Sequence, residues 1–224
     1  MPRNARCIEP GLPYHVTQRG TNRQRVFYSP TDYKMYLSLV REHVEDAECR
    51  VLAYCLMSNH VHVVVVPGRP DSLAVLFRRV HGRYSQYMNT RRHRSGHLWQ
   101  ARFYSCALSE SHRWVALRYV EQNPCRALMA RSPEDYRWSS AAAHVGDGKD
   151  RSGLLDMEFW RKAGGAQTWR EMHAKLETAD QVQLLRRCTY AGRPFGAEDF
   201  VTGLEAQFGR SWRRWGFEKW AVSA

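Results

Sequence analysis

The chain has 224 residues, of which 43% are hydrophobic and 25% are charged. This length is sufficient for a buried core in one large domain, or in one domain with an appendage. Lysine and arginine total 34 against 22 acidic residues, which gives a net charge of +12 and an isoelectric point near 9.7. This excess predicts a polyanionic partner, and a basic surface that only keeps the protein in solution is the alternative interpretation.

Membrane association and disulfide bonding are both excluded by composition. No apolar run reaches the ~18 residues that a membrane span requires, and residues 1–6 lack the apolar segment of a signal peptide. The six cysteines form no C-x-x-C pair and have no disulfide-like spacing, which is typical of reduced thiols in the cytosol. These are Cys7, Cys49, Cys55, Cys106, Cys125 and Cys188.

The first half of the chain shows alternating strand and helix patterns. Residues 14–19 alternate up to a glycine and predict a strand, with a short return strand at 25–28. Ser29 and Pro30 are typical of a helix start, and apolar side chains at spacings of three and four predict a helix over 31–47. Two strands are expected at 50–56 and 60–66, and a second apolar stripe runs from Leu73 to Tyr87. One more strand is expected at 98–107, which completes an α+β, ferredoxin-like antiparallel sheet with packed helices.

The second half of the chain is predicted to be helical. Ser109 is expected to cap a helix that runs to Gln122 and is closed by Asn123 and Pro124. The polar stretch at 146–150 predicts a boundary between a catalytic domain at 1–145 and a helical C-terminal extension at 146–224. Helices are expected there at 154–162, 169–177, 180–188 and 200–208.

Two histidines interrupt the most strand-like stretch of the sequence. His60 and His62 precede the valines at 63–66, and side chains two apart in a strand project from the same face, ~6–7 Å apart. A buried polar ring without a partner costs a few kcal/mol, so two rings on one face predict a shared metal ion or phosphate. Histidines satisfied by hydrogen bonds are the alternative.

A tyrosine and an asparagine lie one helical turn apart at the end of the helix that precedes Pro124. Tyr119 and Asn123 are at i and i+4, so they share a helix face. An amide oxygen is a suitable ligand for Mg²⁺ or Mn²⁺, and a tyrosine hydroxyl near such a cation becomes a stronger nucleophile. Val115, Leu117 and Val120 flank Tyr119, so a position in the core is the alternative interpretation of this tyrosine.

Four motifs in order resemble one family, the single-strand DNA transposases with a His-hydrophobic-His pair and one catalytic tyrosine, and within it the REP-associated tyrosine transposases of bacteria. The motifs are Ser-Asn-His-Val-His at 58–62, Gly-His-Leu-Trp-Gln-Ala-Arg-Phe at 96–103, Tyr-Val-Glu-Gln-Asn-Pro at 119–124 and Trp-Ser-Ser at 138–140. A weaker echo is Gly-Arg-Pro-Phe-Gly at 192–196. Any one motif is weak evidence, but four in order are specific.

The resemblance implies a divalent metal, Mg²⁺ or Mn²⁺, held by His60, His62 and Asn123, with Tyr119 as the nucleophile on a phosphodiester of single-stranded DNA. It further implies cleavage and rejoining at REP-type hairpins through a covalent 5′-phosphotyrosine. The implied protein acts in the bacterial cytoplasm on the nucleoid. Members of the REP-associated group look monomeric, and the long C-terminal extension of this chain also favours a monomer.

Basic and aromatic side chains between the second helix and the last strand form a candidate DNA-binding track, with a solvated basic face as the alternative. Its cations are Arg78, Arg79, Arg83, Arg91, Arg92, Arg94 and Arg102, and Trp99, Phe103 and Tyr104 are expected to stack on unpaired bases. A second cluster near the C-terminus is a candidate DNA clamp, a surface patch or a packed end. It comprises Arg210, Trp212, Arg213, Arg214 and Trp215.

Other enzyme families fit the sequence less well, and two other functions remain open. A zinc hydrolase of the His-x-His-x-Asp-His type would need acidic and histidine side chains where Val64 and Val65 stand. A two-histidine phosphoesterase would need a second His-x-Thr/Ser module at useful spacing, which neither His81 nor His112 provides. Tyr84, Tyr87 and Tyr104 are rival nucleophiles, although the first two fall on an apolar stripe. A rolling-circle initiator or relaxase, and a DNA-hairpin-binding regulator without chemistry, remain alternatives to the transposase.

Overall fold

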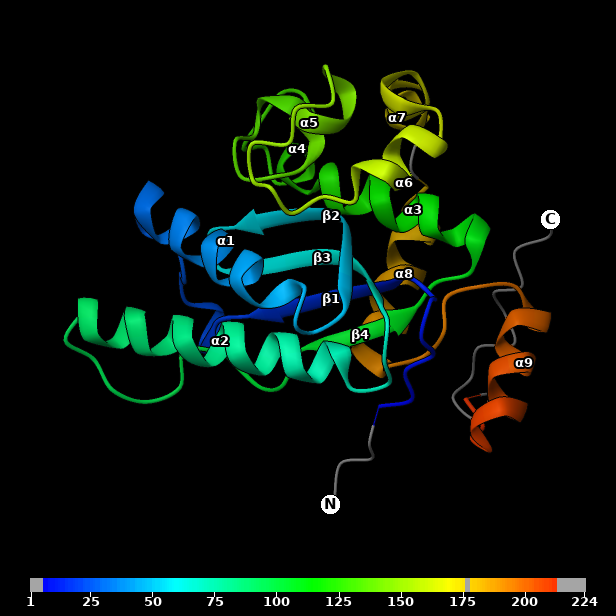
Figure 1. Ribbon diagram of the computed structural model, residues 1–224, viewed down its shortest axis with the longest axis horizontal. Coiled ribbons are helices and arrows are strands. Elements are labelled where there is room, and N and C mark those ends of the chain that lie inside the picture. Colours follow the sequence, from blue (N-terminus) through cyan, green and yellow to red (C-terminus); the bar gives the residue numbers. More distant parts are fainter. Residues whose placement is uncertain (1–5, 176–177, 213–224) are drawn as a thin grey trace.

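A four-stranded antiparallel sheet organises the protein. The computed structural model describes residues 6–175 and 178–212, and Figure 1 shows the arrangement of their helices and strands. The strands are β1 (Tyr14–Arg19), β2 (Cys49–Met57), β3 (His60–Pro67) and β4 (Tyr104–Ala107). They lie in the order β2-β3-β1-β4, and every neighbouring pair is antiparallel. This order, with one helix after β1 and one after β3, confirms the predicted ferredoxin-like α+β fold.

Helices cover both faces of the sheet (Figure 1). On one face lie α1 (Pro30–Val44) and α2 (Ser72–Arg91), and on the other lie α3 (Glu110–Glu121) and α8 (Ala179–Ala191). The remaining described elements are short: η1 (Thr21–Arg23), α4 (Asn123–Arg126), η2 (Pro133–Asp135), α5 (Ala141–Val145), α6 (Met157–Lys162), α7 (Gly165–Ala174) and α9 (Glu198–Phe208).

The side chains of β3 separate two cores. Val61, Val63 and Val65 pack with α1 and α2, whereas Val64 and Val66 pack with α3. Because side chains alternate along a strand, His60 and His62 belong to the same face as Val64. The sequence pattern therefore predicted correctly that both histidines share one face, and the fold directs that face toward α3 and α8.

Two predicted strand segments are irregular in the structure. The return strand expected at 25–28 is wrong: the N–H groups of Val26 and Phe27 both donate to the Ser58 carbonyl, and their side chains are fully buried. The strand expected at 98–107 begins only at Tyr104. Leu98, Trp99 and Phe103 precede it as core side chains packed under α2, so packing outweighs strand pairing there.

The start of α1 is fixed by a capping box that also reaches α2. Ser29 caps the helix, as the sequence predicted, and its N–H donates to Asp32 Oδ2 at 2.8 Å. The Tyr87 hydroxyl on α2 donates to the other oxygen of the same carboxylate at 3.0 Å. Asp32 therefore joins the two helices of this layer as well as capping one of them.

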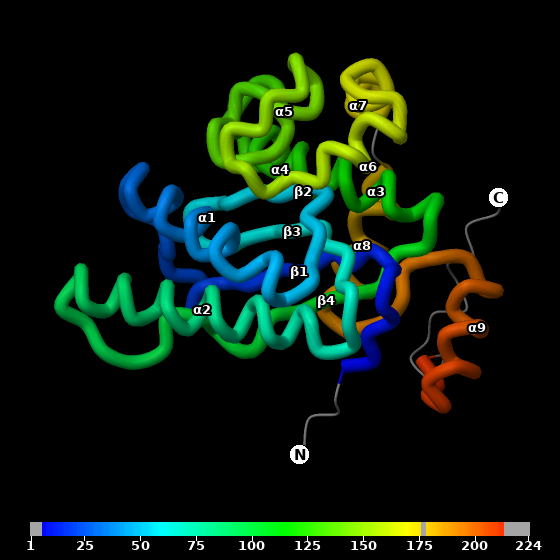
Figure 2. Tube along the Cα trace, in the orientation of Figure 1, coloured from blue at the N-terminus to red at the C-terminus, as the bar shows by residue number. Residues whose placement is uncertain are grey.

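The part of the chain after residue 146 packs directly on the sheet. Figure 2 shows α8 passing behind β1 and β4 and α9 lying beside the N-terminal segment. Two isolated bridges, Val51 with Leu155 and Leu108 with Phe195, tie this part to the first half of the chain. The boundary at 146 stays a prediction. No helix in the described ranges is long and apolar enough to cross a membrane.

Candidate active site

Three histidine rings meet under α3 and α8. His60 and His62 come from β3 with ring centroids 4.8 Å apart, and His15 comes from β1 with its ring stacked on His62 at 5.1 Å. The pairing of Thr17 with His62 in the β1–β3 register places His15 two residues farther along β1 on the same face. His15 and His62 are 1% and 4% exposed.

A chain of hydrogen bonds fixes the tautomer of His62. The Thr189 hydroxyl lies 2.8 Å from the Leu185 carbonyl, which can only accept, so the single hydroxyl proton is used there. Thr189 Oγ1 must then accept from His15 Nδ1 at 2.8 Å, which leaves His15 Nε2 as an acceptor. His62 Nδ1 lies 2.9 Å from that atom and is therefore the donor. The Nε2 atom of His62 keeps its lone pair for a ligand.

An independent set of bonds gives His60 the same tautomer. Asn59 Nδ2 donates to the Arg23 carbonyl at 3.1 Å, and this contact fixes which end of the amide is the oxygen. Asn59 Oδ1 then accepts from His60 Nδ1 at 2.6 Å. Both histidines of the pair thus carry their proton on Nδ1 and leave Nε2 free, the form in which imidazole binds a metal.

Burial keeps all three imidazoles neutral. Desolvation lowers the pKa of His15 to about 3, and desolvation together with Arg19 and Arg186 lowers the pKa of His60 to about 4. Desolvation and the two neighbouring histidines hold the pKa of His62 well below its usual range. Neutral rings are what a cation requires, since a protonated nitrogen cannot act as a ligand.

Tyr119 closes the site from α3. Its ring meets His62 edge-on at 5.4 Å and His15 at 5.6 Å. Arg186 Nε on α8 donates to the Tyr119 hydroxyl at 3.1 Å, and the Arg126 guanidinium lies 4.4 Å from the ring centroid. Two arginine side chains therefore contact a buried tyrosine, one at its hydroxyl and one over its ring.

Asn123 lies at the junction of α3 and α4, one turn after Tyr119, and it is 6% exposed. Its Nδ2 atom is buried without a hydrogen-bond partner. The Nδ2 group is a donor, so a bound phosphate oxygen would satisfy it, whereas only the Oδ1 atom of the same amide can bind a cation. Across residues 6–175 and 178–212 no hydrogen bond joins Asn123 to either histidine of β3 or to Tyr119.

The donor set fits a hard divalent cation. Two imidazoles with free Nε2 atoms and the amide oxygen of Asn123 offer neutral ligands, and a phosphate would complete the coordination. The described residues contain no group of three or more His, Cys, Asp or Glu side chains arranged to hold a metal. An amide as third ligand is outside that definition, so the fit depends on Asn123.

The predicted arginines of α2 lie on the other side of the sheet from Tyr119. Arg79 pairs with Asp46 at 3.3 Å, Arg83 pairs with Glu42, and Arg91 lies 3.4 Å from Asp32. The exposed pairs of Arg79 and Arg83 contribute little to stability, whereas the Asp32 partner of Arg91 is buried. Arg78, Arg92, Arg94 and Arg102 are exposed as well. Their role as DNA contacts stays a prediction.

Two of the aromatic side chains expected to stack on bases are in the core instead. Trp99 is 8% exposed, donates through Nε1 to the His81 carbonyl at 3.2 Å and packs against Tyr84. Phe103 is 7% exposed, with its ring 5.0 Å from Phe77. Stacking needs an open ring face, so these positions cannot supply it as they stand. Tyr104 is partly exposed.

Residues that sequence patterns missed come from β1, α4 and α8: His15, Arg126, Arg186 and Thr189. His15 alternates with Tyr14 and Val16 in β1, which offered a signal for its face but none for its partner. At the C-terminus, Arg210 lies 5.5 Å from the ring centroid of Trp212, which is 7% exposed. Arg213, Arg214 and Trp215 lie outside the described residues.

The ferredoxin-like sheet carries a histidine pair on a central strand and a tyrosine on the covering helix, and the family match places this chain in the class of transposase-like DNA-binding proteins. The chain belongs to one family of this class, described as "Transposase IS200 like", which matches residues 10–123. This match ends at Asn123, so α8 with Arg186 and Thr189 lies beyond it.

A solved structure shares the fold. The structure of a REP-associated tyrosine transposase bound to a REP hairpin is similar with a TM-score of 0.57 and 18% sequence identity, and the alignment covers 70% of this chain and 90% of that chain. A proposed transposase from Deinococcus radiodurans R1 aligns with a TM-score of 0.38 and 17% identity over 54% of this chain and 97% of that chain. No curated protein sequence gives a significant match.

Proposed function

We propose that this protein cleaves and rejoins single-stranded DNA beside REP-type hairpins through a 5′-phosphotyrosine at Tyr119, with Mg²⁺ or Mn²⁺ as cofactor. The observation that carries the proposal is the placement of Tyr119, whose hydroxyl accepts from Arg186 at 3.1 Å and whose ring lies edge-on to neutral His62 with centroids 5.4 Å apart. Membership of the IS200-like transposases supports a reaction on DNA.

The residues of this chain divide the work between binding and chemistry. His60 Nε2, His62 Nε2 and Asn123 would hold the divalent ion, which when bound stabilises negative charge on the phosphate oxygens. Arg186 positions the Tyr119 hydroxyl and stabilises its oxygen as the proton leaves. That oxygen releases its proton to water and attacks phosphorus, the bond to the 3′ oxygen breaks, and the 3′ oxygen takes up a proton from water.

The covalent link gives a transposase its advantage over a nuclease. Phosphotyrosine retains the energy of the phosphodiester, so a second 3′-hydroxyl can reverse the reaction and rejoin a strand. Arg126 supports Tyr119 as the nucleophile, because its guanidinium packs on the ring of Tyr119 and also donates to the Tyr119 carbonyl. The reaction would take place on the bacterial nucleoid, in the cytoplasm, and by one protein molecule.

The test is a denaturing gel of the protein incubated with an end-labelled hairpin oligonucleotide and Mg²⁺ or Mn²⁺. We expect a metal-dependent covalent adduct with the wild type and none with Tyr119→Phe, a change that removes only the hydroxyl. Binding of several hairpins without any adduct in either metal would contradict catalysis. That result would favour the second candidate, a hairpin-binding regulatory protein.

A further inference from the structure

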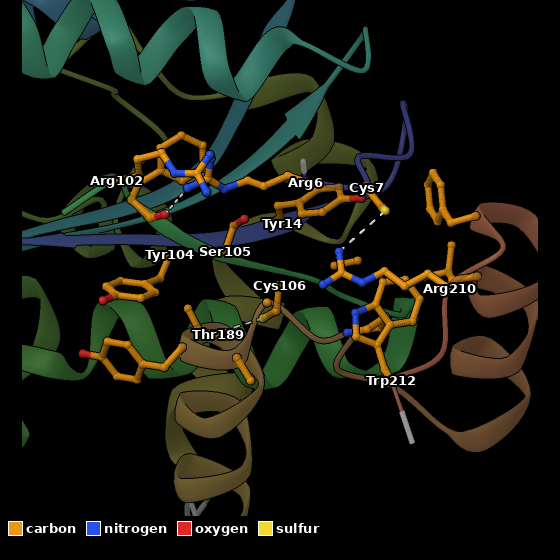
Figure 3. Close-up of a pocket in the computed structure, with 18 of the residues that line it drawn as sticks. Arg6, Cys7, Tyr14, Arg102, Tyr104, Ser105, Cys106, Thr189, Arg210 and Trp212 are labelled. Atoms are coloured by element: carbon orange, nitrogen blue, oxygen red, sulfur yellow. Dashed lines mark hydrogen bonds between the residues drawn. The ribbon is translucent and has the colours of Figure 1, made fainter. Parts of the chain in front are cut away.

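A pocket at the open edge of the sheet, next to β4, is used by none of the chemistry above. Its volume is about 240 Å³, and we call it the β4 pocket. Figure 3 shows Arg6 and Arg102 on one side of it, Tyr104 and Ser105 along β4, and Arg210 and Trp212 opposite. It is smaller than the ~300–1,000 Å³ pockets of drug-sized ligands, so it suits one small planar group.

Two arginines at the pocket leave positive charge uncompensated. Arg6 lies over the Phe103 ring at 3.7 Å and donates to the Phe103 carbonyl, and Arg102 is exposed beside it. Neither forms an ion pair with a carboxylate within residues 6–175 and 178–212. Burial and the charge of Arg102 lower the pKa of Arg6 to about 10. A bound anion would relieve this repulsion.

Two tyrosines supply an aromatic surface at the same place. Tyr104 on β4 and Tyr190 on α8 meet with ring centroids 5.0 Å apart and an interplanar angle of 69°. Tyr190 is 45% exposed, which is unusual for a large aromatic side chain within residues 6–175 and 178–212. An exposed tyrosine next to paired arginines is the combination that binds unpaired bases by stacking and cation contacts.

The strand edge adds one donor and one acceptor. The carbonyls of Phe103 and Ala107 both point away from β1, because they accept from Arg6 and from the N–H of Phe195. Ser105 lies between them in the strand alternation, so its N–H and C=O point to the same open edge. Within the described part of the chain, neither backbone group of Ser105 has a hydrogen-bond partner.

The pocket is connected to the candidate active site through α8. Arg186, which donates to the Tyr119 hydroxyl, and Tyr190 are at i and i+4, so they lie on one helix face ~6 Å apart along the axis. Thr189 lines the pocket and also accepts from His15. A DNA strand whose scissile phosphate lies at Tyr119 would therefore have to extend along α8 by only about one helical turn to reach the β4 pocket.

We propose that the β4 pocket binds one unpaired base of single-stranded DNA adjacent to the scissile phosphate, and this inference rests on the proposed function. Tyr190 stacks on the base, Tyr104 contacts the base beside it, Ser105 pairs with its edge through the main chain, and Arg6 with Arg102 bind the neighbouring phosphate. The helical part of the chain thus contributes to the substrate site, beyond the residues of the family match.

The test measures binding without metal, so that it does not depend on cleavage. The probe is a fluorescent stem-loop oligonucleotide with unpaired deoxythymidines on both sides, and each unpaired position is replaced in turn by an abasic site. We expect Tyr190→Ala to weaken binding of the intact probe roughly 5- to 150-fold, the range for loss of one stacked base. One abasic position should weaken wild-type binding equally and abolish the effect of the mutation.

Two variants serve as controls, and a third tests the phosphate contact. Tyr190→Phe keeps the ring and should bind like the wild type, and Lys34→Gln, an exposed cation on α1, should not change affinity at any abasic position. Arg102→Gln should reduce the salt dependence of binding by about 0.7 in slope, the value for one single-strand phosphate. Equal loss with intact and abasic probes, or equal wild-type affinity for probes with and without unpaired bases, would overturn the proposal. Absence of a Tyr119 adduct would overturn the proposed catalysis alone.

Discussion

His15 Nε2 lies 2.9 Å from His62 Nδ1, so a side chain of β1 orients a predicted metal ligand of β3. The contact joins neighbouring strands, and Thr189 on α8 extends it to a third element. A ligand ring held in this way loses little rotational freedom when it binds a cation. The geometry therefore predicts that residues remote from the ion control its affinity.

Thr189→Val tests that control, because valine keeps the shape of threonine and removes its hydroxyl. We expect His62 to lose its preference for the Nδ1–H tautomer and the affinity for Mn²⁺ to fall roughly 10- to 100-fold. Long-range ¹H–¹⁵N spectra report the tautomer without metal, and a calorimetric titration reports the affinity. Thr189→Ser, which restores the hydroxyl, should behave like the wild type. An unchanged tautomer in Thr189→Val would refute the hydrogen-bond chain.

Arg186→Gln addresses the nucleophile rather than the metal. Loss of the donor to the Tyr119 hydroxyl should slow formation of the covalent adduct roughly 10²- to 10³-fold, as for other charge-stabilising donors. Single-turnover kinetics at saturating hairpin DNA separate this effect from weaker binding. Arg187→Gln, the neighbouring exposed arginine on α8, is the matched control and should react at the wild-type rate. Similar rates for both variants would remove Arg186 from the reaction.

The sequence was sufficient for the fold because its apolar periods are strong. The valine alternation in β3 and the stripes of α1 and α2 predicted the two faces of the sheet and the shared side of His60 and His62. The sequence was not sufficient to predict which residues surround the candidate active site. His15 and Thr189 are 174 residues apart and meet only through tertiary packing. The burial of Trp99 and Phe103 likewise depends on how the segment before β4 folds under α2.

Stability should depend on pH through His81, a buried histidine of α2 far from the candidate active site. Its Nε2 lies 3.0 Å from the Tyr36 hydroxyl, and desolvation lowers its pKa to about 3. Because the folded state resists protonation, the contribution of His81 is complete above the unfolded pKa of ~6.5 and is lost as pH falls from there toward 3.

Each depressed histidine adds up to ~1.4 kcal/mol per pH unit to the slope of unfolding free energy within that window. His81→Gln should therefore reduce the slope between pH 6 and pH 4 by about that amount, measured by urea denaturation at a series of pH values. At pH 7 the variant is expected to be less stable than the wild type, because the packing of the buried His81 ring is lost. If the unfolding free energies of the wild type and of His81→Gln change with pH at the same slope, His81 is not kept neutral in the folded protein.

Glu121 should be the most costly single position to change among the charged residues of α3. It is fully buried between two histidines, with Oε1 2.5 Å from His144 Nδ1 and Oε2 2.9 Å from His173 Nε2. Burial alone would raise the pKa of this carboxyl, but His144 and His173 outweigh it and lower the pKa to about 2. An ionised carboxylate thus connects α3 to α5 and α7.

Glu121→Leu leaves both histidines and the Ser140 hydroxyl without their acceptor, and loss of one partner of a buried network costs about 3–5 kcal/mol. We expect a fall of that size in the unfolding free energy by urea denaturation, in a metal-free buffer. The double variant Glu121→Leu with His144→Leu should recover part of it, because apolar side chains then fill the space on both sides. If the double variant is less stable than the single one, His144 contributes through packing on Trp169, whose ring lies 4.6 Å away, rather than through the carboxylate.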